Sequence, residues 1–269
     1  MRLMSDLEQY LPQQPARRVS QTTAVEQSRA VAEVQAAVTV ALQFPRDMQR
    51  AYAEMRAACG RLALAERAFY SVPKRGNGPS VHLARELARI WGNVDYGVRE
   101  LSRDDEAGMS EIQAYAWDQQ TNVRSSRTFQ VPHQRMAGGK RQPLTDLGDV
   151  YLNNQNIGAR AVREAIFTVL PNEFVELAQD ICHATLKNGD GVPVADRIDK
   201  AVKAFAGLGI SLDRLEAKIG KKRGQWDAQQ VADLGIWHQS ITRDGVDAES
   251  LLPEIVVDLD GALIPEATR

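Results

Sequence analysis

Residues 93–135 read NVDYGVRELSRDDEAGMSEIQAYAWDQQTNVRSSRTFQVPHQR, and apolar and polar residues alternate along three stretches of this segment. Alternation at every second position is typical of a β-strand with one buried face. The sequences DDEAG and TN between the stretches supply residues that turns prefer. The segment therefore predicts a three-stranded antiparallel meander, with Ile112, Ala114 and Ala116 on one face and Tyr115 and Trp117 on the other.

Helical periodicity surrounds this meander. Apolar residues recur at helical spacing from residue 22 to Pro45, from Met48 to Cys59, and again after Ser80. A short strand is expected over residues 67–73, and two helices are expected over residues 156–170 and 172–186. The expected fold class is α+β, in which the three-stranded antiparallel meander packs with helices.

Composition divides the chain into four segments. Between Asp244 and Glu266 there are seven carboxylates and no Lys or Arg, which predicts an acidic tail that repels polyanions. The glycine-rich sequence KNGDGVP at 187–193 reads as a linker before further helices. The predicted organisation is a mobile N-terminal leader (1–21), a core (22–186), a small helical C-terminal module (187–243) and an acidic tail (244–269).

The composition favours a soluble, cytoplasmic protein. The chain of 269 residues has a formal net charge of −2. Cys59 and Cys182 are its two cysteines, and both lie in helical patterns, which favours core positions and a reducing compartment. The sequence shows no signal peptide and no run of eighteen apolar residues, so no membrane association is expected.

The sequence PKRGNGPS at 73–80 superficially suggests a phosphate-binding loop. A Walker loop needs two glycines five residues apart, followed at once by Lys and Ser or Thr, and that spacing is absent. ATP hydrolysis is therefore not expected. A glycine-rich turn before a helix can still present amides to an anion, with Lys74 and Arg75 adding charge. A plain turn with solvated cations is the alternative.

The sequence gives little support for a metal site or for a catalytic nucleophile. The four histidines lie far apart without ligand spacing, so we expect neither a metal nor a cofactor. Asp95, Glu100, Glu111 and Asp118 on the meander are interpreted as solvated surface groups. A nuclease that uses them is a third, weaker alternative.

One segment of the chain has a local excess of cations, which favours binding of a polyanion. Residues 124–163 contain seven Lys and Arg and only two carboxylates, Asp146 and Asp149. Arginines that follow phosphates, together with aromatic rings that contact bases, are the components of a single-strand site. Core packing is the alternative for each ring. The candidate DNA-binding residues are Lys74, Arg75, Arg124, Arg127, Arg135, Lys140, Arg141, Arg160 and Arg163, with Trp117 and Phe129 as base contacts.

Three stretches, GPSVHLARELARIWGN (78–93), AYAWDQQTNVRSSRTFQVPH (114–133) and NIGARAVREAIFTVLP (156–171), carry a family resemblance. In this order and spacing they resemble the single-strand annealing proteins of phages and prophages, the superfamily of RecT, Red beta and the Sak groups. This superfamily is related in fold to the eukaryotic Rad-type annealing protein. The similarity spans about Phe69 to Leu186, and its motifs are specific in combination.

The resemblance implies a non-enzymatic protein of homologous recombination, encoded by a phage or prophage and acting in the bacterial cytoplasm. It implies ATP-independent binding of single-stranded DNA, annealing of complementary strands into a duplex intermediate, and a homo-oligomer in the form of a ring or helical filament. Residues 212–241 are similar to the helical module that relatives use toward the host single-strand binding protein, and a partner exonuclease is implied as well. Gln120 departs from the acidic residue found in many relatives. The alternative function is a non-catalytic oligomeric scaffold or assembly protein.

Overall fold

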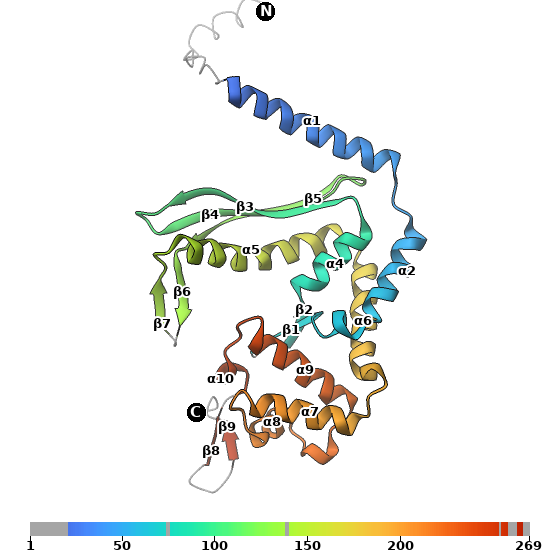
Figure 1. Cartoon of the computed structure of the whole chain (residues 1–269), viewed down its shortest axis with the longest axis vertical. Helices are drawn as coiled ribbons and strands as arrows, with labels where there is room; N and C mark the ends of the chain where they lie inside the picture. The colour runs from blue at the N-terminus through green and yellow to red at the C-terminus, as the bar shows by residue number, and fades with distance from the viewer. Residues whose placement is uncertain (1–20, 74–75, 138–139, 253, 258–262, 266–269) are drawn as a thin grey trace, which may run out of the picture. The chain divides into compact units, whose positions relative to one another are not determined.

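A computed structural model of the chain describes residues 21–73, 76–137, 140–252, 254–257 and 263–265 (Figure 1). The chain forms two compact units, 1–45 and 46–269. The first contains α1 (Gln21–Gln43), the helix that the apolar spacing predicts. Its side chains Val31, Val34 and Leu42 are exposed. The predicted leader lies, apart from Gln21, outside the described residues.

The second unit contains the predicted meander, which the structure confirms. Strands β3 (Val94–Asp104), β4 (Met109–Asp118) and β5 (Val123–Pro132) form an antiparallel sheet in the order β3-β4-β5. The register places Ala114 opposite Val98 and Arg127, and it places Tyr115 opposite Gly97 and Ser126. Because directly paired residues share a face, the two predicted faces of β4 are confirmed. Helices pack against the sheet, so the fold is α+β.

The helix α5 (Leu147–Val169) lies along one face of this sheet (Figure 1). It begins nine residues before the helix that the sequence predicts from residue 156. Gly158 lies directly against β3, because a Cβ added there would be 2.7 Å from Val98 Cγ1. The absence of a side chain at this position therefore sets how closely α5 approaches the sheet.

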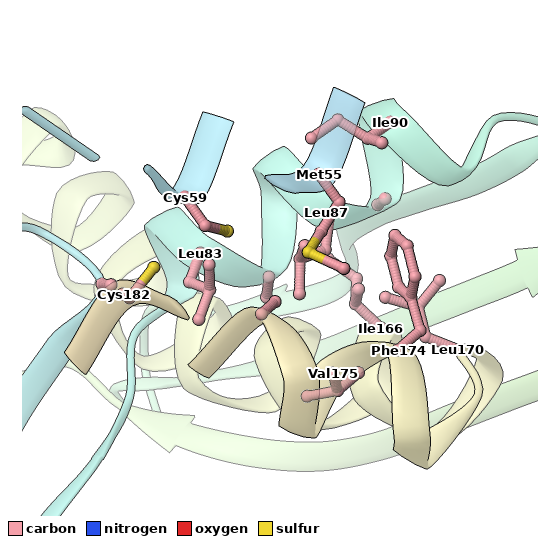
Figure 2. Close-up of a cluster of buried hydrophobic side chains, with 14 of the residues drawn as sticks. Met55, Cys59, Leu83, Leu87, Ile90, Ile166, Leu170, Phe174, Val175 and Cys182 are labelled. Atoms are coloured by element: carbon pink, nitrogen blue, oxygen red, sulfur yellow. The ribbon is translucent and has the colours of Figure 1, made fainter. Parts of the chain in front are cut away.

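The main hydrophobic core joins α5 to three other helices (Figure 2). Met55, Leu87, Ile166 and Phe174 are among its fully buried side chains. Cys59 and Cys182 are both free and buried in this core, which confirms the sequence-based interpretation. The Cys59 side chain and burial both raise the pKa of the Cys182 thiol, so that thiol stays protonated and unreactive. The three helices are α2 (Met48–Cys59), α4 (Val81–Trp91) and α6 (Asn172–Asn188), with the short α3 (Leu62–Ala65) beside them.

Two segments interpreted from the sequence as turns or loops form short hairpins. β1 (Phe69–Val72) is the predicted strand, and it pairs with β2 (Gly76–Pro79) inside the glycine-rich PKRGNGPS stretch. β6 (Gln134–Ala137) pairs with β7 (Lys140–Pro143) where the glycine-rich, cationic sequence MAGGKRQPLTD (136–146) predicts a loop. Figure 1 shows the β6–β7 hairpin on the side of α5 opposite the sheet. These hairpins were missed because four-residue strands offer too few positions for alternation to be recognised.

The helices after residue 187 have an apolar cluster of their own, which includes Phe205, Leu215 and Leu234. The last long helix of this segment also adds Ala232 and Ile236 to the main core. Ser240 Oγ of that helix accepts a hydrogen bond from the Ser71 N–H at 2.7 Å. The elements are η1 (Gly189–Gly191), α7 (Val194–Ala206), α8 (Leu212–Ile219), η2 (Arg223–Gln225) and α9 (Ala228–Thr242), followed inside the predicted tail by α10 (Ala248–Leu251), β8 (Ile255–Val257) and β9 (Leu263–Pro265).

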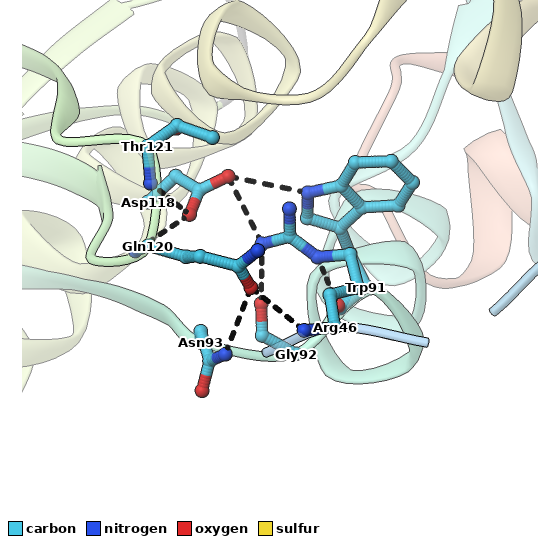
Figure 3. Close-up of polar contacts among 7 residues, drawn as sticks. All are labelled: Arg46, Trp91, Gly92, Asn93, Asp118, Gln120 and Thr121. Carbon is cyan, nitrogen blue, oxygen red and sulfur yellow. Dashed lines mark hydrogen bonds and ion pairs between the residues drawn. The ribbon is translucent and has the colours of Figure 1, made fainter. Parts of the chain in front are cut away.

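A buried ion pair fastens α4 to the end of β4 (Figure 3). Arg46 Nη2 donates to Asp118 Oδ2 at 3.0 Å, and the two side chains are only 5% and 2% exposed. The same guanidinium donates to the Trp91 and Gly92 carbonyls at 2.6 and 3.0 Å. These carbonyls lie at the C-terminal end of α4, where the helix dipole favours a positive charge. The guanidinium also lies 4.2 Å from the Trp91 ring centroid. Asp118 is thus buried and paired, which corrects its interpretation as a solvated surface group.

We predict that Gly158→Ala destabilises the fold, although alanine usually favours a helix interior over glycine. The new Cβ would meet Val98 Cγ1 and Cγ2 at 2.7 and 2.9 Å, and we expect a loss of about 1–3 kcal/mol in the free energy of unfolding. Val98→Ala in the same chain should recover part of the loss. Urea unfolding of both single variants and the double variant measures this coupling, and additive losses would contradict the proposed contact.

We also predict that Arg46→Met and Asp118→Asn each lower the free energy of unfolding by about 3–5 kcal/mol at pH 7, since each leaves a buried partner uncompensated. The double variant should lose less than the sum of the two single losses.

Burial alone would raise the pKa of Asp118, but the hydrogen bond and charge of Arg46 hold that pKa below its ordinary value. The stabilisation from this carboxylate is therefore present above about pH 4 and lost as the pH falls through the depressed pKa. Urea unfolding from pH 7 to pH 2 should show a smaller acid-dependent loss for Asp118→Asn; an unchanged acid dependence would contradict the assignment.

Candidate nucleic-acid interface

One continuous segment carries cations and no carboxylates. Residues 119–145 contain five Lys and Arg and no Asp or Glu, and strands β5, β6 and β7 lie within this range. Four arginines of the segment are exposed, and none of them forms an ion pair with a carboxylate that the structure describes. We call these four residues the cationic strip: Arg124, Arg127, Arg135 and Arg141.

Within the sheet, the strip lies at an edge. β5 pairs only with β4 among the described strands, so one side of its backbone has no strand neighbour. Ser126 and Thr128 of β5 are exposed between the arginines. Hydroxyl groups and free backbone N–H groups donate hydrogen bonds to phosphate oxygens, as arginine does. The edge therefore offers several donors for one polyanion.

Arginine and aromatic side chains stack on the face of the sheet away from α5. The Arg124 guanidinium lies 3.9 Å from the Trp117 ring centroid, and Arg99 lies 4.3 Å from the Tyr115 ring centroid. Tyr115 lies across Gly97, where an added Cβ would be 3.2 Å from a ring carbon. The Trp117 indole N–H donates to Asn122 Oδ1 at 3.1 Å. These contacts hold the two rings flat on the sheet.

This stacking changes the role expected for Trp117. The ring is only 7% exposed, and Arg124 covers it, so a base cannot stack on it without displacing the guanidinium. Arg124 itself is exposed. Arg99 was not predicted from the sequence. Alternation along β3 places it on the same face as Tyr115, and that signal could have identified it.

Phe129 lies on the other face of the sheet from Trp117. Its register partner is Ile112, which is buried on the helical face of the sheet. Phe129 is partly buried and packs against the main core there, which agrees with the core-packing alternative. Arg127 shares this face, but its side chain is exposed at the edge of the sheet. Arg127 and Arg124 therefore approach the edge from opposite faces.

The two predicted arginines of α5 differ. Arg160 is exposed. Arg163 is 15% exposed, pairs with Glu164 at 2.8 Å and lies 4.5 Å from the Tyr70 ring centroid in β1. Arg163 thus connects α5 with the β1–β2 hairpin, and its charge is partly compensated.

In the PKRGNGPS corner, two backbone amides are used within the fold. The Ser80 N–H donates to the Ala68 carbonyl at 2.8 Å, and Ser80 Oγ accepts from the Leu83 N–H at 3.2 Å as the cap of α4. β2 is paired with β1 along its length. Lys74 and Arg75 lie outside the described residues, as does the side chain of Lys140.

The remaining meander carboxylates take part in local hydrogen bonds. Glu100 accepts from Ser110 Oγ at 2.9 Å, and Asp95 accepts from the Tyr115 hydroxyl at 3.4 Å. Glu111 accepts from Ser102 Oγ at 3.4 Å. Across the described part of the chain, no three His, Cys, Asp or Glu side chains gather where they could hold a metal ion.

Comparison with protein-family models, with curated proteins and with solved structures finds no match to this chain. Among the helices of the described residues, none combines the length and the apolar character that crossing a bilayer requires.

Proposed function

We propose that this protein binds single-stranded DNA along the cationic strip and anneals complementary strands without ATP. The observation that carries the proposal is the run of 27 residues, 119–145, with five cations and no carboxylate. Its described arginines are exposed at one edge of the sheet and on the adjoining hairpin. A polyanion gains from each of these cations without meeting a like charge in the same segment.

The strip has the components of a single-strand site. These are exposed arginines that can follow phosphates and an arginine–aromatic stack, Arg124 on Trp117. Arginine contacts to phosphates carry no base information, so binding is expected for any sequence. Bases that are not enclosed stay available for Watson–Crick pairing. Neutralising the phosphates of one strand lowers its repulsion toward a complement, and pairing itself then supplies the specificity.

Annealing by weak contacts calls for repetition along the strand, which a homo-oligomer provides. Helix α1 offers a surface for self-association, because Val31, Val34 and Leu42 are 57%, 45% and 65% exposed. These residues recur at spacings of three and eight, so they share one side of the helix. The same exposed row also suits the alternative function, an oligomeric scaffold that binds no DNA.

We predict that Arg124→Gln with Arg127→Gln weakens binding of single-stranded oligonucleotides of every sequence. Each phosphate contact to a single strand contributes about 0.7 to the slope of log affinity against log salt, so losing two should reduce the slope by about 1.4. Fluorescence anisotropy with a mixed-sequence oligonucleotide over a series of salt concentrations measures the slope.

The matched control is Arg29→Gln with Arg50→Gln, which removes the same charge from exposed helix positions paired with glutamates. The control should keep the wild-type slope. If both double variants lose the same slope, net charge alone governs binding and the strip is not the site. If wild-type protein binds no oligonucleotide at low salt, the scaffold function is favoured.

Self-association through α1 gives a separate prediction. Val34→Asp places a charge in the exposed apolar row and should shift the protein toward smaller species in sedimentation velocity with an oligonucleotide present. Ala36→Asp is the control, because two residues along a helix turn the side chain to the opposite side of α1. Both positions are exposed, so neither change should unfold the helix. If the two variants sediment as species of equal mass, α1 is not part of the self-association interface.

A further inference from the structure

A second group of arginines lies away from the cationic strip. A cavity of about 560 Å³ is lined by four arginines, with His82 and Tyr96. It opens beside α3, α4 and the start of β3, which is the edge strand opposite β5. The four arginines are Arg61, Arg67, Arg85 and Arg89.

The charge of this cavity is poorly compensated. Glu86 is the one carboxylate in its lining, and it pairs with Arg89 at 2.8 Å. The hydrogen bond from Arg89 lowers the pKa of Glu86 although burial opposes this, so the carboxylate is ionised at neutral pH. No described carboxylate forms an ion pair with Arg61, Arg67 or Arg85. Arg61, Arg67 and Arg85 therefore line the cavity without an ion pair of their own, and Glu86, already paired with Arg89, is the carboxylate whose charge also acts on Arg61.

His82 adds a neutral polar group to the same wall. Arg67 Nη2 lies 3.0 Å from His82 Nδ1, and because arginine can only donate, that ring nitrogen accepts. Burial, and then the charges of Arg67 and Arg85, lower the pKa of His82, so it is neutral at pH 7. Nε2–H then remains a donor. The cavity thus presents donors and positive charge, with Ala63, Leu64 and Tyr96 as its apolar part.

We infer that this cavity binds a phosphate monoester, either of a free nucleotide or of a phosphorylated DNA end. A terminal phosphate carries a charge between about −1.5 and −2 near pH 7, more than the single charge of a backbone diester. The planar forks of several arginines match its oxygens in bidentate geometry. The cavity volume is within the range of small-molecule sites, roughly 300–1,000 Å³, and Tyr96 can contact the attached base. The inference does not depend on annealing by the strip.

Titration calorimetry tests the site with deoxyadenosine 5′-monophosphate and with pyrophosphate as probes. Arg61→Gln with Arg85→Gln should weaken binding of both by at least about tenfold, since each change removes a charge-assisted contact. Arg29→Gln with Arg50→Gln should bind as the wild type does. Arg85→Lys keeps the charge but loses the fork, and it should show an intermediate affinity. The exposed, unpaired positions of Arg61 and Arg85 favour normal folding, which thermal unfolding checks.

The source of the phosphate is distinguished with 5′-phosphorylated and 5′-hydroxyl oligonucleotides. Tighter binding of the phosphorylated oligonucleotide, lost in the Arg61/Arg85 variant, supports a DNA end as ligand. If the Arg61/Arg85 variant weakens binding of the mononucleotide but not of the phosphorylated oligonucleotide, the result supports a free nucleotide as ligand. The inference is overturned if neither probe binds saturably, if pocket and control variants bind equally, or if the pocket variant weakens the hydroxyl oligonucleotide as much as the phosphorylated one. None of these results depends on whether the protein anneals strands.

Discussion

The packing of one helix on one face of a three-stranded sheet determines how the second unit presents its side chains. α5 can approach β3 because Gly158 has no side chain against Val98, and this contact buries the face that carries Ile112, Ala114 and Ala116. The period of two along β4 then directs Tyr115 and Trp117 to the other face. Arg99 and Arg124 stack on these rings there. The arrangement of cations on the sheet therefore follows from which face is buried.

Charge is distributed along the chain more unevenly than a net value of −2 indicates. The carboxylates of β3 and β4 are used in hydrogen bonds or, at Asp118, in a buried ion pair. The following 27 residues have none, so the arginines of β5 and the β6–β7 hairpin remain uncompensated among the described residues. A polyanion is a natural counterpart for such a segment. The arginine cavity at the opposite edge of the sheet has the same imbalance in a concave form.

Sequence patterns predicted the elements whose burial is periodic. The meander, α1, α2, α4 and α6 agree because each has enough residues for one face to repeat. α5 begins earlier than predicted because its first turns contain Gly148, Asn153 and Asn154, which weaken the helical pattern. The Arg46–Asp118 pair joins residues 72 positions apart, and no local pattern indicates it. The cavity was missed for a similar reason: His82, Arg85 and Arg89 have helical spacing, but only the fold brings Arg61 and Arg67 to them.

The rate at which two complementary labelled oligonucleotides pair, followed by energy transfer without any nucleotide triphosphate, tests the central claim most directly. Wild-type protein should accelerate pairing at low salt, high salt should suppress the acceleration, and replacing the four strip arginines by glutamine should abolish it while the fold is retained. Pairing at the uncatalysed rate with wild-type protein, or undiminished acceleration by a folded variant without the strip, would contradict the account.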